Sequence, residues 1–155
     1  MESAPGDDYE TKSYRLILPR DANHHGTLYA GVLLTVALEE AYATAFRASG
    51  LNANLVLKRV LDLRCREPVR IGQVIEIRGR EVHRARAQSV VGLYGSPLSP
   101  DRNTPWLDAL MQFVQVDETG RPMPLVGSSE GSFEGMGEPW DGLRARGLKL
   151  LSVRF

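Results

Sequence analysis

Two adjacent glutamates, Glu39 and Glu40, lie in a segment that is otherwise apolar and rich in alanine and leucine. An unpaired carboxylate is costly in such surroundings, so these side chains need solvent, a partner or a chemical task. The chemical task would be that of a nucleophile or a general base, because burial raises the pKa of a carboxyl group. The structural alternative is that one glutamate faces solvent while the other pairs with an arginine.

A polar loop, residues 20–31, precedes this segment and ends at Ala30 and Gly31. The first N–H groups of a helix have no partner within the helix and carry a partial positive charge. They therefore suit an oxygen atom that becomes negative during a reaction. His24 and His25 in the loop are poor ligands for a single metal ion because they are adjacent, and the loop holds no other His or Cys. We predict no metal site and no cofactor.

The apolar segment itself, residues 32–49, predicts a helix. It contains no Gly or Pro, and Gly50 and Asn52 follow it as a stop signal. The helix would be apolar on almost every side, which indicates that other elements enclose it. A short strand over 14–18, stopped by Pro19, is expected before it.

Alternation of apolar and polar residues predicts four strands after the helix. In the first of them, Leu57 and Leu61 share one side with Leu63 and Cys65. The expected strands cover residues 57–66, 73–82, 87–94 and 106–116. The chain therefore reads as an α+β domain over residues 14–126, with one strand, one long helix and then four strands.

Both ends of the chain differ in composition from this domain. Residues 1–13 are polar and acidic, which predicts a mobile arm. Residues 127–142 are dense in Gly, Ser and Glu and predict a flexible connection, in which Phe133, Met136 and Trp140 serve as apolar anchors. The C-terminal extension regains apolar character over 143–155, which fits either a short strand or a terminal helix turn against a neighbour, and we expect the strand.

Composition excludes several classes of protein. The chain has 155 residues, of which 43% are hydrophobic, and its formal net charge is zero. A neutral chain of this size predicts one domain without a wide nucleic-acid surface. The longest apolar run, residues 32–38, is far shorter than the roughly 20 residues that span a membrane. A lone Cys65 and the lack of a signal-like N-terminus indicate a cytoplasmic protein.

Basic residues gather in the middle of the chain. Between Lys58 and Arg86 there are nine arginines and lysines against four acidic residues. Such a segment is either a solvated sheet face or a landing site for a phosphorylated ligand. Composition alone leaves both interpretations open.

Three motifs, in order along the chain, resemble the hotdog-fold acyl-CoA thioesterases. The family pattern is Asn-x-x-Gly, an aromatic residue or His, and then Gly-Gly. The matching stretches here are Asp21-Ala-Asn-His-His-Gly-Thr-Leu-Tyr-Ala-Gly31, Glu67-Pro-Val-Arg-Ile-Gly72 and Phe113-Val-Gln-Val-Asp-Glu-Thr-Gly-Arg-Pro122. The resemblance covers residues from about 14 to 124. It implies an antiparallel sheet wrapped around one long central helix, and hydrolysis of acyl-CoA by a homodimer or higher homo-oligomer whose active sites lie between subunits.

The resemblance also implies roles for single residues near the helix start. Asn23 matches the asparagine that positions water or the thioester, and Gly31 matches the second glycine. Many relatives place an aspartate where this chain has Leu38, so the predicted catalytic acid is the next residue, Glu39. The residues expected around the substrate in this region are His25, Tyr29, Ala30 and Glu40, with Ala30 and Tyr29 replacing the first glycine and the aromatic or His of the pattern.

The resemblance gives the basic segment a purpose, because arginines bind the phosphates of CoA well. The candidates are Arg84, Arg86 and Ser89, at the hairpin and strand where relatives often bind CoA. Arg64 and Arg66 are instead expected to pair with Asp62 and Glu67.

Two other functions on the same fold stay open at this level. The departure at Leu38 favours an acyl-CoA binding protein without catalysis. A loop histidine, His24 or His25, paired with an acid would favour an enoyl-thioester hydratase or dehydratase. A hydratase releases no free thiol, so a thiol assay separates it from a thioesterase.

Overall fold

A computed structural model describes residues 10–125 and 133–153 of the chain. Residues 1–9 of the predicted arm (1–13), residues 127–132 of the predicted connection (127–142), and residues 126, 154 and 155 lie outside the described residues. The described elements are the strands β1 (Glu10–Leu16), β2 (Leu55–Cys65), β3 (Val74–Ala85), β4 (Gln88–Gly95) and β5 (Leu107–Gln115), the helices α1 (Ala30–Ala48) and α2 (Trp140–Ser152), and a single 3-10 turn, η2 (Pro19–Asp21).

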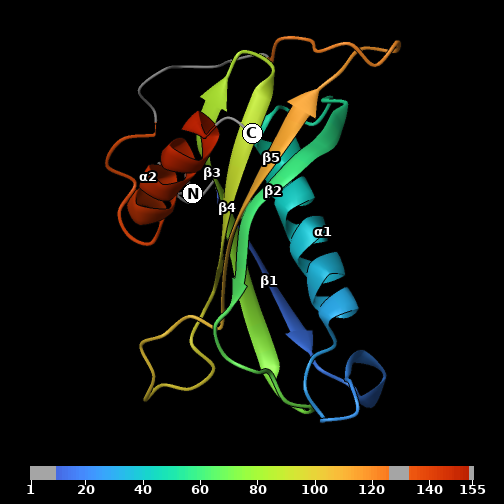
Figure 1. Ribbon diagram of the computed structural model, residues 1–155, viewed down its shortest axis with the longest axis vertical. Helices are drawn as coiled ribbons and strands as arrows, with labels where there is room; N and C mark the ends of the chain where they lie inside the picture. The colour runs from blue at the N-terminus through green and yellow to red at the C-terminus, as the bar shows by residue number, and fades with distance from the viewer. Residues whose placement is uncertain (1–9, 126–132, 154–155) are drawn as a thin grey trace, which may run out of the picture.

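The five strands form one antiparallel sheet in the order β1-β3-β4-β5-β2. The helix α1 lies along one face of this sheet and α2 lies on the other face (Figure 1). Ala37, Ala41 and Ala45 are fully buried where α1 meets the sheet, and their small side chains let the helix lie close to the strands. The predicted central helix and the hotdog arrangement are confirmed.

The strand β1 begins at Glu10, four residues before the predicted start. Residues 10–13 are held in the sheet by contacts with residues that are distant in the sequence, which a local sequence pattern does not predict. Arg78 pairs with Glu10 at 3.1 Å, and the hydroxyl of Thr11 hydrogen-bonds that of Thr44 on α1. Residues 10–13, which were expected in the mobile arm, therefore belong to the sheet.

The predicted C-terminal strand is wrong, because the chain from Trp140 to Ser152 forms the helix α2. Trp140, Leu143 and Gly147 are buried at spacings of three and four residues, which is the period of a helix face. They cover the second apolar cluster of the sheet, which contains Val82, Val90 and Leu110. The predicted anchors Trp140 and Met136 are confirmed, with Met136 partly buried against this cluster.

Asp108 on β5 ties α2 to the sheet. Its carboxylate accepts hydrogen bonds from Arg66 and from Arg146 of α2. Burial raises the pKa of Asp108, but the two guanidinium groups outweigh burial and lower the pKa below its ordinary value. Arg66 thus pairs with Asp108 rather than with the predicted Glu67, whereas the predicted contact of Arg64 with Asp62 is confirmed at 3.1 Å.

Candidate active site

Asn23 holds the loop that leads into α1. Its Oδ1 accepts the backbone N–H groups of His25 at 2.9 Å and of Thr27 at 3.2 Å. Its Nδ2 lies 3.1 Å from the hydroxyl of Thr27. An amide nitrogen carries two hydrogens, so Nδ2 keeps one donor for water or a ligand after this contact. The loop geometry therefore leaves Asn23 able to fulfil the predicted positioning role.

Asp21 is a second residue that organises the loop, and the sequence analysis gave it no role. One carboxylate oxygen accepts the N–H of Leu18 at 2.9 Å and the other accepts Arg15 at 3.0 Å. The Leu18 N–H, and then Arg15, lower the pKa of Asp21, which keeps it ionised. The available signal was an aspartate two residues after Pro19, where a short turn begins.

The start of α1 offers open backbone donors. The N–H of Leu33 donates to the carbonyl of Tyr29 at 3.0 Å, closing the first helical turn. Those of Ala30, Gly31 and Val32 have no acceptor among the described residues, as expected for a helix start. The Tyr29 ring folds over Gly31, because a Cβ on Gly31 would lie 2.6 Å from Tyr29 Cε1. Gly31 is therefore required for this ring position.

The two glutamates of α1 occupy different environments. Glu39 is exposed and has no ion pair or hydrogen bond within the described ranges. Glu40 is buried against β1, where its Oε2 accepts the hydroxyl of Ser13 at 2.7 Å and its Oε1 is buried without a hydrogen-bond partner. The structural alternative, in which one glutamate pairs with an arginine, is wrong for the buried Glu40, because its partner is Ser13.

Leu38 directly precedes these two carboxylates in α1. It is partly buried and packs against the cluster beneath α1. Leu34 and Tyr42, one turn before and one turn after it, are 43% and 42% exposed. The side of α1 that carries Leu38 is therefore an apolar stripe that reaches the surface.

The predicted CoA-binding residues Arg84 and Ser89 are buried in a network at the far end of α1. The guanidinium of Arg84 lies 2.8 Å from Glu81 Oε2 and donates to the carbonyl of Ala48 at 2.9 Å. The hydroxyl of Ser89 donates to the same carboxylate. This network fixes the last turn of α1 to the β3-β4 hairpin, about 28 Å from the helix start along the axis of the 19-residue helix. Because Arg84 and Ser89 are buried in this network, their positions within one chain do not support a role in binding CoA.

Arg86 differs from these two residues because it is exposed at the tip of the same hairpin. It has a φ of 21°, and its carbonyl accepts the N–H of Leu125 at 2.8 Å. Its side chain makes no hydrogen bond or ion pair with another residue in the described part of the chain. A role for Arg86 in binding CoA stays a prediction.

The loop histidines are exposed and lie against each other, with ring centroids 3.9 Å apart. Neither contacts a carboxylate within the ranges 10–125 and 133–153, so one chain alone does not form the His–acid pair of the hydratase alternative. In those ranges no three His, Cys, Asp or Glu side chains are grouped as metal ligands. Neither α1 nor α2 has the length and apolar character of a helix that spans a membrane.

Comparison with known proteins identifies the fold. No family model and no curated protein sequence matches the chain. An acyl-CoA hydrolase from Staphylococcus aureus, solved with butyryl-CoA, CoA and CoA disulfide, superposes with a TM-score of 0.72 at 20% identity, covering 93% of this chain and 85% of that one.

Two further structures agree with that one. A hexameric acyl-CoA thioesterase without ligand has a TM-score of 0.72 at 24% identity and covers 99% of this chain and 100% of its own. An acyl-CoA hydrolase from Bacillus cereus has a TM-score of 0.69 at 16% identity, covering 94% of this chain and 85% of the hydrolase. Likeness at these identities establishes architecture, and the chain is a hotdog-fold protein.

Proposed function

We propose that this protein is an acyl-CoA thioesterase that hydrolyses an acyl thioester to a free acid and CoA. The observation that carries the proposal is the start of α1, where three open N–H groups adjoin the loop held by Asn23. Backbone donors fixed in this way stabilise the oxyanion of acyl transfer. The structures with the same fold support the choice of substrate, because they include hydrolases bound to butyryl-CoA and CoA.

In the proposed reaction, the N–H groups at Ala30 and Gly31 polarise the thioester carbonyl. Glu39 attacks the carbonyl carbon or takes a proton from a water molecule that does so, and Asn23 orients that water. The tetrahedral intermediate then collapses, the C–S bond breaks, and the CoA sulfur leaves and is protonated to the thiol. When Glu39 attacks directly, this step leaves a mixed anhydride of Glu39 and the acyl group, which a water molecule then hydrolyses to the free acid and the Glu39 carboxylate. When Glu39 acts as a base, the attacking water becomes part of the acid, and protonated Glu39 returns the proton to the sulfur.

This chemistry requires two subunits. Glu39 follows Gly31 by eight residues, which separates them by about 12 Å along the helix axis. The open N–H groups point out of the helix start, away from Glu39. An oxyanion bound by those groups therefore lies beyond the reach of Glu39 in the same chain. A carboxylate from a second copy completes the proposed site, which agrees with the predicted homo-oligomer.

Of the two edges of the sheet, β1 and β2, the β2 edge is the one we propose for contact with a second copy. The edge strand β2 exposes Val56, Leu57 and Val60 at 44%, 42% and 40%. The exposed stripe of α1 through Leu34 and Tyr42 adds to this surface, since the ring of Tyr42 meets that of Phe113 on β5, the neighbour of β2. An exposed apolar edge strand invites pairing with another chain.

Val60→Lys is expected to convert the oligomer to a smaller species, because a charge at the apolar edge must be desolvated when the edges pair. Val74→Lys is the matched control, since Val74 is 61% exposed beside the opposite edge strand. Light scattering coupled to gel filtration measures the mass of both variants. Dissociation by Val74→Lys, with Val60→Lys unchanged, would move the interface to the β1 side.

The test of the function is release of free thiol from a panel of acyl-CoAs with different chain lengths. Thiol release at enzymatic rates from at least one ester is the expected result.

A protein that binds these esters without releasing thiol is a non-catalytic acyl-CoA binding protein, and one observation favours that second function. Alanine variants of the S. aureus hydrolase replace an asparagine and an aspartate that are 15 residues apart. The residue 15 positions after Asn23 is Leu38, which cannot act as an acid or a base.

A cytoplasmic location stays a prediction.

A further inference from the structure

Asp21 is a buried carboxylate that lies between the edge strand β1 and the start of α1. Its side chain is only 5% exposed. One oxygen, Oδ2, accepts the N–H of Leu18 at 2.9 Å, and the other, Oδ1, accepts Nη2 of Arg15 at 3.0 Å. The N–H of Asp21 donates to the carbonyl of Leu18 at 2.9 Å, which closes the short turn η2. Both the side chain and the backbone of Asp21 are therefore fixed.

The backbone carbonyl of Asp21 extends this fixed position to the helix start. It accepts the N–H of Tyr29 at 2.8 Å, and Tyr29 is the residue directly before α1. The N–H groups of Ala30 and Gly31, which are the proposed oxyanion donors, follow Tyr29 in the chain. Such donors act when they lie about 2.7–3.1 Å from the oxyanion, so a small shift of the peptide that leads into them weakens the contact.

The strand β1 supplies the positive charge that holds Asp21. Arg15 lies on the same face of β1 as Ser13, because side chains two residues apart in a strand point to one side. Ser13 contacts Glu40, so this is the face that meets α1. A hydrogen bond between charged groups is roughly twice as strong as one between neutral groups. The contact of Arg15 with Asp21 therefore ties the loop firmly to the sheet.

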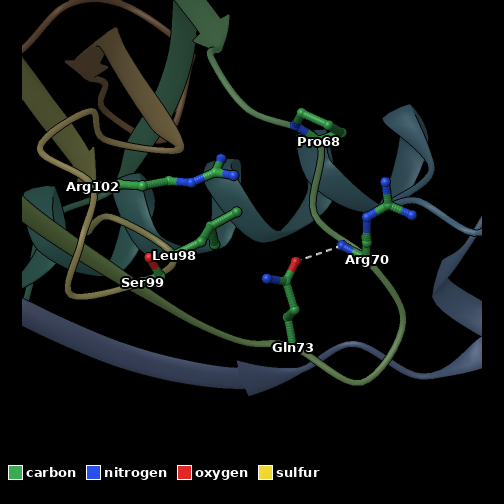
Figure 2. A pocket seen from close by; sticks show the side chains of 6 residues that line it. All are labelled: Pro68, Arg70, Gln73, Leu98, Ser99 and Arg102. Carbon is green, nitrogen blue, oxygen red and sulfur yellow. Dashed lines mark hydrogen bonds between the residues drawn. The ribbon is translucent and has the colours of Figure 1, made fainter.

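Contacts that do not involve Asp21 hold the middle of the loop. The backbone of residues 26–28 pairs with residues 69–71 of the β2-β3 turn through N–H to carbonyl contacts of 2.8 and 3.2 Å. This turn is closed by Gln73, whose Oε1 accepts the backbone N–H of Arg70 at 2.7 Å (Figure 2). A change at Asp21 leaves this support in place, and its effect is expected at the helix start.

We propose that Asp21, held by Arg15, is a positioning residue for the thioesterase reaction and determines where the oxyanion donors at the start of α1 lie. Asp21 contacts neither the thioester nor the attacking water. It acts through the N–H groups of Ala30 and Gly31. The effect on the rate rests on the proposed function, whereas the effect on the helix start rests on the contacts of Asp21.

The first experiment compares two substrates: the acyl-CoA that wild type hydrolyses fastest, and its dithioester analogue, in which sulfur replaces the carbonyl oxygen. Sulfur is a weak hydrogen-bond acceptor, so the oxyanion donors favour the thioester. Asp21→Ala is expected to lower the ratio of the two kcat/KM values about tenfold, which is part of the hundredfold or more that a whole donor contributes. The ratio is independent of the amount of folded enzyme, so a purely structural role leaves it unchanged.

Asp117→Ala is the matched control, because Asp117 also accepts two backbone N–H groups, at 2.8 and 3.0 Å, in the turn after β5. It is expected to keep the wild-type ratio. Asp21→Asn keeps an oxygen that accepts the Leu18 N–H but loses the charge that attracts Arg15, so a smaller fall in the ratio is expected. This variant also serves as the test if Asp21→Ala does not fold. An unchanged ratio in the folded Asp21 variants, or an equal fall in Asp117→Ala, overturns the proposal.

Deuterium exchange of backbone amides, measured by mass spectrometry, tests the same contacts without a substrate. In the Asp21 variants, the segment from Tyr29 to Leu33 is expected to lose protection relative to α2, whereas Asp117→Ala keeps it. Equal protection of this segment in the Asp21 variants and wild type contradicts the positioning role. If wild type releases no thiol from any ester, the proposed function fails, and the exchange still decides whether Asp21 holds the helix start.

Discussion

Glu39→Gln is expected to lower the rate of thiol release from acyl-CoA by about a hundredfold or more, the usual contribution of a general base. Glutamine keeps the size of the side chain but neither accepts the proton nor attacks the carbonyl. Glu39 is exposed and has no described partner, so the variant should unfold at the same denaturant concentration as wild type. The loss would therefore report on chemistry rather than on stability.

Glu40→Gln is the matched control for this experiment, because it makes the same change one residue later in the same helix. Glu40 accepts a hydrogen bond from Ser13, which a glutamine carbonyl oxygen also accepts. Its rate of thiol release is expected to stay within a few-fold of wild type. If the loss instead falls on Glu40→Gln alone, the buried carboxylate with its open Oε1 is the acid, and Glu39 has no part in the reaction.

Trp140→Ala is expected to lower the free energy of unfolding by about 3–5 kcal/mol, the usual cost of removing a buried aromatic side chain. Trp140 is 3% exposed and joins α2 to the outer face of the sheet. Its ring lies 5.8 Å from the guanidinium of Arg78, which also faces the ring of Tyr94 at 4.9 Å. The variant thus loses both an apolar contact and a cation-π contact.

Urea denaturation followed by circular dichroism measures this effect. Tyr14→Ala is the control, because Tyr14 is an aromatic residue that is 64% exposed, and we expect it to change stability by less than about 0.5 kcal/mol. A change below about 1 kcal/mol for Trp140→Ala would mean that α2 is not part of the cooperative unit. A lower urea slope in the variant would indicate that α2 detaches before the sheet unfolds.

The elements that the sequence predicts well are those whose pattern is purely local. The helix α1 was expected over 32–49 and spans Ala30–Ala48, because an uninterrupted run of helix formers ends at a glycine. The alternation in β2 is less informative, since register shifts follow Leu57 and Val60. A shift reverses the side to which later residues point, so Leu57 is 42% exposed although it was grouped with Leu61 and Leu63. Such bulges depend on the partner strand.

In the candidate site, too, features set by neighbouring residues could be predicted, and features set by contacts distant in sequence could not. The positions of Asn23 in the loop and of Gly31 at the helix start could be predicted because the loop and the helix start are adjacent in the sequence, while their roles stay predictions. The burial of Arg84 and Ser89 could not, because it depends on Glu81 and on the end of α1, which meet only after the sheet has formed. The anchoring of α2 by Asp108 likewise joins residues 38 positions apart. Sequence patterns predict contacts between residues that are near each other along the chain. These ion pairs join residues that become neighbours only in the folded structure.

The strand order also determines how long each strand waits for its partner while the chain is being synthesised. Leu55 of β2 pairs with Gln115 of β5, and Leu16 of β1 pairs with Val74 of β3, so both edge strands are synthesised long before their partners. The apolar helix α1 likewise precedes most of the sheet face that covers it. At about 5–20 residues per second, translation leaves this helix uncovered for several seconds. We therefore expect the nascent chain to engage chaperones until β5 has emerged, and synonymous codons that slow translation between α1 and β5 to lower the yield of folded protein.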